Sequence, residues 1–210
     1  MNLKKQVRQY LEDYNRQGLI NLLVEDRRVI PALNRLIFDE DITTRWRAVE
    51  ALGWVAREEP YLLEKIIARL IYTMNDDSGS IGWTAPQALG EICASDPDLV
   101  EDFFPIVIDA ISNEVFRAGS AWAIGRVAPV RPDLVEETGP ALGRYLGDPD
   151  PTVRGYCAWA LGRLGRPGAV PRLEEFSRDH GTLIFYREGE ICTVTVAQLV
   201  QEALDKLRTV

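Results

Sequence analysis

The chain has 210 residues, of which 46 % are hydrophobic and 27 % charged, as in ordinary globular proteins. Asp and Glu outnumber Lys and Arg by 32 to 24, and the net charge of −8 argues against duplex nucleic acid or a membrane surface as a partner, because phosphate binding needs clustered cations. No apolar run approaches the roughly 20 residues that span a bilayer, the N-terminus has no signal-peptide core, and the three cysteines are far apart. We therefore expect a cytoplasmic protein without a disulfide framework.

The first predicted element is an amphipathic helix over residues 2–17, which we expect to cap the N-terminal edge of the fold. Beyond it the sequence repeats. Four similar segments end in glycines spaced by 37, 35 and 37 residues: 45–53, 82–90, 117–125 and 154–162. A Pro-x-Leu-x-Glu motif that begins at residues 60, 97 and 132 keeps the same phase. Two motifs in one phase indicate internal repeats at about 29–58, 60–94, 97–130 and 132–166.

Each repeat is predicted to consist of two helices. The three prolines suit the first position of the first helix, where a missing N–H costs no hydrogen bond, and these helices run to about residues 72, 111 and 146. Twelve residues before each closing glycine lies a good helix-capping residue, namely Asp41, Ser78, Asn113 and Asp150. Pro86 falls inside the second helix of the second repeat, where we expect it to remove a hydrogen bond and kink the helix.

Residues 148–165 have the sequence DPDPTVRGYCAWALGRLG, which resembles the short HEAT-repeat type called the PBS-lyase HEAT-like repeat. The resemblance covers about residues 29–178. It implies an all-α fold, a right-handed α-α superhelix with capping helices, in which the second helices line the concave face. It also implies a ladder of Asp–Arg contacts between repeats that would use Arg45, Arg117 and Arg154, and Gly82 interrupts this ladder in the second repeat.

The C-terminal part, residues 168–210, is predicted to form a cap with a different periodicity. Strand-like residues over 182–194 are joined through Glu188-Gly189, which indicates a small β-hairpin. Thr195 and Gln198 form the pattern of a capping box that opens a last helix, which ends at about Leu207. No linker divides the chain, so we expect one domain over residues 1–210.

All five tryptophans fall on one stripe of the second helices. Relative to the closing glycines, Trp46 and Trp83 lie seven residues before, Trp122 and Trp159 three before, and Trp54 one after. These offsets differ by four, so they share one helix face. Because alanines and leucines define the core face, we expect this tryptophan stripe to line the concave surface. The Trp122→Ala and Trp159→Ala substitutions should then abolish partner binding and leave the melting temperature nearly unchanged.

The same face carries polar and charged side chains that we expect to contact a ligand. Glu50 and Glu91 lie in the N-terminal half of the groove, and Arg126 and Arg163 in the C-terminal half. An arginine beside an aromatic ring suits a carboxylate or phosphate on an apolar body. The predicted partner-binding residues are Trp46, Arg47, Glu50, Trp54, Trp83, Gln87, Glu91, Trp122, Arg126, Tyr156, Trp159 and Arg163.

An uncovered stripe would exceed the apolar patch typical of a monomer, so something should cover it. Three alternatives remain open: a peptide, protein or small-molecule partner, a homo-oligomer that buries its concave faces, or the chain's own hairpin through Phe185 and Tyr186.

The sequence has a single histidine, no Gly-rich phosphate loop and no Cys-x-x-Cys motif, and we predict no catalytic residues, metal site or cofactor. The favoured function is a non-enzymatic binding or adaptor module for a peptide, a protein segment or an apolar anionic ligand. Two alternatives come from the resemblance. One is an assembly factor or lyase-like subunit for a cofactor-containing protein. The other is a HEAT-like DNA glycosylase, because Trp46, Glu50 and Trp83 loosely resemble the concave tryptophans and carboxylate of such enzymes. The acidic net charge argues against this alternative.

Overall fold

A computed structural model describes residues 2–75 and 83–209 and shows a mostly helical chain with one two-stranded sheet. The N-terminal half contains helices α1 (Leu3–Glu12), α2 (Arg16–Glu25), α3 (Val29–Leu36), α4 (Ile42–Glu58), α5 (Glu64–Asn75), α6 (Ala85–Ser95) and α7 (Phe104–Asp109). The C-terminal half contains α8 (Arg117–Val127), α9 (Pro132–Val135), α10 (Gly139–Tyr145), α11 (Pro151–Leu164), α12 (Val170–Glu174), β1 (Thr182–Arg187), β2 (Glu190–Thr195) and α13 (Val196–Arg208).

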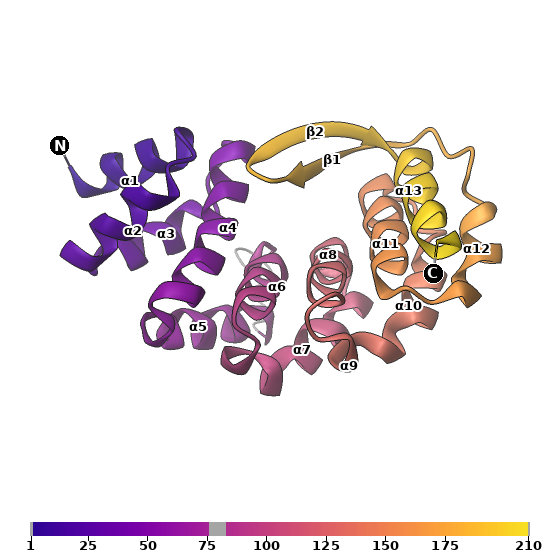
Figure 1. Ribbon diagram of the computed structural model, residues 1–210, viewed down its shortest axis with the longest axis horizontal. Helices are drawn as coiled ribbons and strands as arrows, with labels where there is room; N and C mark the ends of the chain where they lie inside the picture. The colour runs from indigo at the N-terminus through magenta and orange to yellow at the C-terminus, as the bar shows by residue number, and fades with distance from the viewer. Residues whose placement is uncertain (1, 76–82, 210) are drawn as a thin grey trace.

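The helices form two layers of a curved solenoid (Figure 1). Helices α4, α6, α8, α11 and α13, here called the inner helices, pack each on the next in that order. Helices α5, α7, α9 and α10 lie along the outer side of the curve. The hairpin of β1 and β2 extends from α13 back across the inner side to α4 (Figure 1). The predicted all-α solenoid with a small C-terminal hairpin is therefore confirmed.

The closing glycines explain how closely the inner helices approach one another. A Cβ atom added at Gly90 would lie 2.6 Å from the Cβ of Ala123, and one added at Gly162 would lie 2.6 Å from the Cα of Ala203. Real Cβ atoms do not tolerate such distances, so the repeat needs glycine where one inner helix crosses the next. The recurrence of these glycines along the chain thus reflects helix packing.

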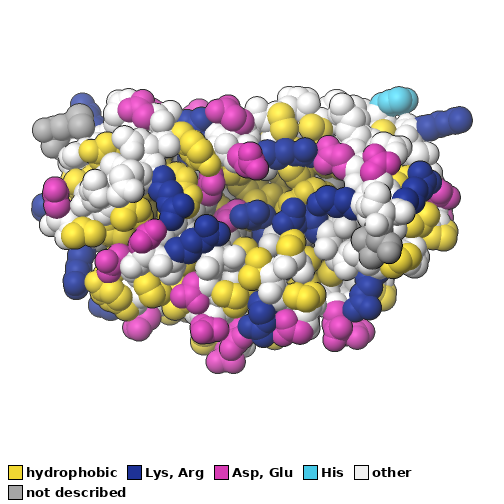
Figure 2. Space-filling model, in the orientation of Figure 1, with side chains coloured by type: hydrophobic (Ala, Val, Ile, Leu, Met, Phe, Trp, Pro, Cys, Tyr) yellow, Lys and Arg dark blue, Asp and Glu magenta, His cyan; other side chains and the backbone are white. Residues whose placement is uncertain are grey.

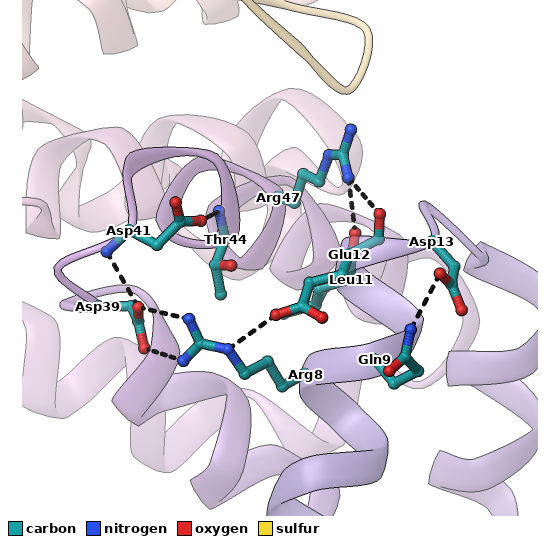
Figure 3. Close-up of polar contacts among 9 residues, drawn as sticks. All are labelled: Arg8, Gln9, Leu11, Glu12, Asp13, Asp39, Asp41, Thr44 and Arg47. Atoms are coloured by element: carbon teal, nitrogen blue, oxygen red, sulfur yellow. Dashed lines mark hydrogen bonds and ion pairs between the residues drawn. The ribbon is translucent and has the colours of Figure 1, made fainter.

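Two of the predicted helix caps are confirmed. The Asp41 carboxylate accepts a hydrogen bond from the Thr44 backbone N–H at 2.7 Å (Figure 3), and Asp150 accepts one from the Thr152 N–H at 2.8 Å. The prediction for Asn113 is wrong, because its side chain instead accepts from the Val115 N–H at 3.0 Å inside a turn, and α8 begins only at Arg117. Ser78 lies outside the described residues.

The kink predicted at Pro86 is also wrong. Helix α6 begins at Ala85, so Pro86 lies in its first turn, where the backbone N–H has no partner inside the helix. The prolines that do interrupt helices belong to the outer layer. Pro105 and Pro140 each lie in the first turn of a new helix, α7 and α10, after a short 3₁₀ turn. The outer helices predicted as continuous in the third and fourth repeats are therefore broken.

Two of the three predicted ladder arginines reach a carboxylate in the unit that follows, which is the fourth repeat for Arg117 and the C-terminal cap for Arg154. Arg117 Nη1 lies 2.8 Å from Asp148 Oδ2, and Arg154 Nε lies 2.7 Å from Asp179 Oδ2. The third, Arg45, lies with its guanidinium 4.6 Å from the centre of the Trp83 ring. Gly82, the predicted interruption, lies outside the described residues.

The N-terminal cap contains two helices, not the single helix predicted over residues 2–17. Helix α1 ends at Glu12, and Tyr14 has a positive φ of 50°, which reverses the chain before α2. Arg8 on α1 binds Asp39 through Nη1 at 2.8 Å and Glu12 through Nε at 2.9 Å (Figure 3). This contact joins the cap to the end of α3.

The hairpin has the predicted turn. Strands β1 and β2 pair antiparallel from Thr182 opposite Thr195 to Arg187 opposite Glu190. The two turn residues, Glu188 and Gly189, have φ values of 48° and 86°, as a two-residue turn with left-handed backbone requires. The capping box of Thr195 and Gln198 at the start of α13 is confirmed as well.

Candidate ligand-binding cavity

The hairpin covers part of the tryptophan stripe. The Tyr186 ring stacks on the Trp46 ring, with centroids 5.4 Å apart and planes at 8°. The Phe185 ring meets the Trp159 ring edge-on at 5.4 Å and 75°. Both hairpin side chains are buried. Of the three covers considered for the stripe, the chain's own hairpin occupies the inner surface.

The five tryptophans therefore differ in environment. Trp122 is only 2 % exposed and lies between Trp46, at 4.9 Å, and Trp159, at 6.1 Å. Trp46 and Trp54 are also buried, Trp159 is half-buried, and Trp83 is 39 % exposed. The expectation of five rings on an open concave surface is thus wrong for Trp46, Trp54 and Trp122, because the rings pack on one another and under aromatic side chains from other segments.

Arg47 holds the tip of the hairpin. Its buried guanidinium donates to the backbone carbonyl of Gly189 at 2.7 Å, and to those of Leu11 at 3.1 Å and Glu12 at 2.6 Å. Figure 3 shows the two contacts to the end of α1. The negative end of the α1 dipole adds to these bonds. In this structure Arg47 is an internal contact between α1, α4 and the hairpin, and it faces no open groove.

Glu50 is fixed beneath the same tip. The Tyr14 hydroxyl donates to Glu50 Oε1 at 2.8 Å, and the Tyr186 hydroxyl donates to Oε2. Burial, followed by the neighbouring carboxylate, raises the pKa of both phenols above the ordinary value. Both tyrosines therefore remain protonated donors, and they orient a carboxylate that has no cationic partner within ion-pair distance among the described residues.

A cavity of about 500 Å³ lies between the inner helices and the hairpin, here called the hairpin cavity. Its lining combines aromatic rings with charges of both signs: Glu50, Glu91, Trp122, Arg126, Trp159, Arg163, Phe185, Tyr186, Arg187, Glu188, Glu202 and Lys206. On the face shown in Figure 2, a band of Lys and Arg side chains crosses the middle of the molecule over α6, α8 and α11, beside hydrophobic side chains.

Two of these charges neutralise each other inside the cavity. Arg126 binds Glu91 through two contacts, Nε to Oε1 at 2.8 Å and Nη2 to Oε2 at 2.9 Å. Glu91 is 4 % exposed, and burial raises the pKa of its carboxyl although Arg126 opposes the shift. At the rim, Arg187 and Glu202 form a second pair, at 2.6 Å.

Two other cations have no such partner. Arg163 lies over the Trp159 ring at 5.2 Å and donates from Nε to the Gly125 carbonyl at 2.7 Å. Burial lowers the pKa of the Arg163 guanidinium, and Arg126 lowers it further; burial and Arg163 together lower the pKa of Lys206. Neither Arg163 nor Lys206 makes an ion pair within residues 2–75 and 83–209. Two neighbouring cations without a counter-ion create a site suited to an anion.

The predicted partner-binding residues are divided between two places. Six of them line the hairpin cavity, namely Glu50, Glu91, Trp122, Arg126, Trp159 and Arg163. A separate cavity of about 320 Å³ is lined by four more, Trp46, Trp83, Gln87 and Tyr156. The remaining two, Arg47 and Trp54, line neither. The binding role of these residues stays a prediction.

Sequence reasoning missed Glu202 and Lys206 because it treated α13 as a cap, and it missed Arg187 and Glu188 because it treated the hairpin as part of that cap. A related signal was present at a longer spacing than that of the repeats: Ala203-Leu204 corresponds to the Ala-Leu or Ala-Ile pair before each closing glycine. Gly162 packs on Ala203 as Gly90 packs on Ala123. Helix α13 thus continues the inner layer, and Lys206 occupies the position that Arg126 and Arg163 occupy in their helices.

The three cysteines provide a simple test of the packing. Burial raises the pKa of the Cys93 thiol to about 12 and also raises that of Cys157, whereas Cys192 on β2 is only half-buried. We expect a thiol reagent such as DTNB to modify one thiol per native chain quickly and the other two only after unfolding. The Cys192→Ser variant should lose the fast phase; a fast phase that survives this change would contradict the described packing.

No described helix is both long and apolar enough to cross a membrane. Among residues 2–75 and 83–209, no group of three His, Cys, Asp or Glu side chains could hold a metal ion.

Comparison with known proteins gives matches to the fold. Residues 104–183 match the family model described as HEAT repeats. Two engineered proteins from the Northeast Structural Genomics Consortium each have a TM-score of 0.59. The first is 14 % identical, and the match covers 98 % of this chain and 90 % of that protein. The second is 16 % identical, and the match covers 100 % of both chains. An archaeal HEAT-like repeats protein from Thermococcus onnurineus NA1 has a TM-score of 0.44 at 14 % identity, over 98 % and 80 %. No curated protein matches the sequence.

Proposed function

We propose that this chain, which is a HEAT-repeat protein, is a non-enzymatic interaction scaffold that binds an anionic group, carried on an apolar body, in the hairpin cavity. The observation that carries the proposal is the convergence of Arg163 and Lys206 on that cavity without a carboxylate partner among the described residues. The bound group would be a carboxylate or a phosphate, either at the end of a protein segment or on a free organic anion.

The shape and walls of the cavity support this class of ligand. Its volume of about 500 Å³ is in the range of small-ligand sites, roughly 300–1,000 Å³. Trp159 and Phe185 offer apolar contact next to Arg163, whose planar guanidinium binds carboxylates and phosphates through two hydrogen bonds. Because the hairpin crosses the inner surface, a chain terminus or a small molecule fits this site better than a long peptide laid along all repeats.

The alternatives of an assembly factor, a lyase-like subunit and a DNA glycosylase stay predictions, as do the homo-oligomer and the cytoplasmic location. The chain's one histidine, His180, is not among the residues that line the hairpin cavity.

The proposal predicts charge-dependent binding of simple probes. In isothermal titration calorimetry, 3-phenylpropionate and phenyl phosphate should bind, and the matched neutral amide, 3-phenylpropanamide, should bind at least about tenfold more weakly, since a hydrogen bond to a charged group contributes roughly 1.5–3 kcal/mol. A hexapeptide with a free carboxyl terminus, compared with its amidated form, tests the protein-segment source.

Matched variants locate the site. Arg163→Gln and Lys206→Gln should each weaken anion binding about tenfold or more. Arg208→Gln, which removes a cation that pairs with Glu174 at 3.0 Å, is the control and should bind as the wild type does. Equal affinity for anion and amide, or no binding of either anion at millimolar concentration, would exclude the proposed function.

A further inference from the structure

Once the paired charges of the hairpin cavity are set aside, the remaining charges lie at opposite ends. Arg126 with Glu91, and Arg187 with Glu202, neutralise each other. The cavity-lining charges left over are Glu50 and Glu188 on one side and Arg163 and Lys206 on the other. Each of them alone would be an ordinary polar lining residue. Together they separate negative from positive charge along the cavity.

The order of the inner helices fixes this separation. Glu50 is on α4 and Glu188 is at the hairpin tip that contacts α4, whereas Arg163 is on α11 and Lys206 on α13 (Figure 1). Helices α6 and α8 lie between these ends, and α8 contributes Trp122 to the wall. One end of the cavity is therefore acidic, the other is basic, and aromatic rings lie between them.

The acidic end is prepared for a cation. Two neutral donors, the hydroxyls of Tyr14 and Tyr186, orient the Glu50 carboxylate without cancelling its charge. Tyr186 lines the same cavity beside Glu50, and the Glu50 carboxylate offers an ammonium group a charged hydrogen-bond acceptor. An anion alone would leave this end of the cavity unused.

We infer that the ligand of the hairpin cavity is a short zwitterion, a peptide or peptide-like molecule with an ammonium group bound near Glu50 and a carboxylate bound by Arg163 and Lys206. The inference rests on the proposed function and specifies its ligand. A sphere of 500 Å³ is about 10 Å across, and an extended chain spans about 3.3–3.6 Å per residue, so two or three residues fit. The aromatic walls select an apolar middle side chain.

Four forms of one tripeptide, Ala-Phe-Ala, test the inference by isothermal titration calorimetry: free at both ends, N-acetylated, C-amidated, and blocked at both ends. The free form should bind at least about tenfold more tightly than either singly blocked form, and the doubly blocked form should bind most weakly. Glu50→Gln should remove the advantage of the free form over the N-acetylated form while the carboxylate is still recognised. Arg163→Gln should do the reverse and remove discrimination against the amidated form.

The Glu50→Gln side chain can accept fewer hydrogen bonds from the two tyrosines than Glu50 does, so the melting temperature of this variant should be recorded. Glu188→Gln at the exposed tip is a second, milder variant, which should also reduce the advantage of the free form over the N-acetylated form. If the N-acetylated and free forms bind equally while the amide binds weakly, the zwitterion is excluded and the proposed anion site stands. If no form binds and 3-phenylpropionate does not bind either, both proposals fail.

Discussion

Replacing Trp122 with alanine is expected to lower the free energy of unfolding by about 3–5 kcal/mol, the usual cost of removing a buried tryptophan. The side chain is 2 % exposed and contacts the rings of Trp46 and Trp159. In a chain of this length each kcal/mol lowers the melting temperature by about 2–4 °C, so a fall of roughly 6–20 °C should appear in a thermal melt. This result would be opposite to the one expected for an exposed binding residue.

Trp83→Ala is the matched control, because the same residue type lies 39 % exposed near the start of α6. Its removal should cost less than about 1 kcal/mol. The emission of the wild-type protein should be that of buried indoles and should shift to longer wavelength when the chain unfolds. If Trp122→Ala melted within about 2 °C of the wild type, Trp122 would not be buried between Trp46 and Trp159 in solution.

Arg47→Ala is expected to release the hairpin tip. The change removes donors to three backbone carbonyls, those of Leu11, Glu12 and Gly189, in a buried place. A single hydrogen bond from a charged donor contributes about 1.5–3 kcal/mol, so the loss of these three should lower the free energy of unfolding by at least about that amount. Hydrogen exchange should report the location: amides of β1, β2 and the end of α1 should lose protection.

Arg16→Ala provides the comparison for this experiment. Arg16 pairs with Glu58 at 3.0 Å, and both side chains are more than two-fifths exposed. Exposed pairs contribute about 0–1 kcal/mol, so stability and exchange in the hairpin should hardly change. Equal protection of the hairpin in the wild type and in Arg47→Ala would show that the aromatic contacts of Phe185 and Tyr186 hold it without the arginine.

Features set by local sequence were predicted correctly. The turn at Glu188-Gly189, the capping box at Thr195 and the caps at Asp41 and Asp150 each depend on residues within a few positions of one another. Asn113 failed although it is a good capping residue, because residues 114–116 form a turn before α8 begins. A capping residue indicates that a helix can begin nearby, and it does not determine the residue at which the helix begins.

The environment of the tryptophan stripe could not be predicted in the same way. The spacing of four correctly placed Trp46, Trp122 and Trp159 together on the inner face. Whether that face was open depended on where the hairpin packs, and Arg47 and Gly189, which decide it, are 142 residues apart in the chain. Helical periodicity carries no information about a contact between residues so far apart in the sequence. Of the two cations at the basic end of the cavity, only Arg163 was predicted, from its position relative to the closing glycine of its repeat. Lys206 was not predicted, because α13 follows the hairpin at a longer spacing than that of the repeats.

A repeat protein ordinarily tolerates the gain or loss of a repeat, because each unit contacts only its neighbours and the ends are free. Here the hairpin that leads into the last inner helix is bonded to the first repeat through Arg47 and Glu50. These contacts hold the two ends of the solenoid at a fixed distance from each other. An inserted or deleted repeat would carry the hairpin tip away from α1 and α4, so the length of this solenoid is set by its own closure.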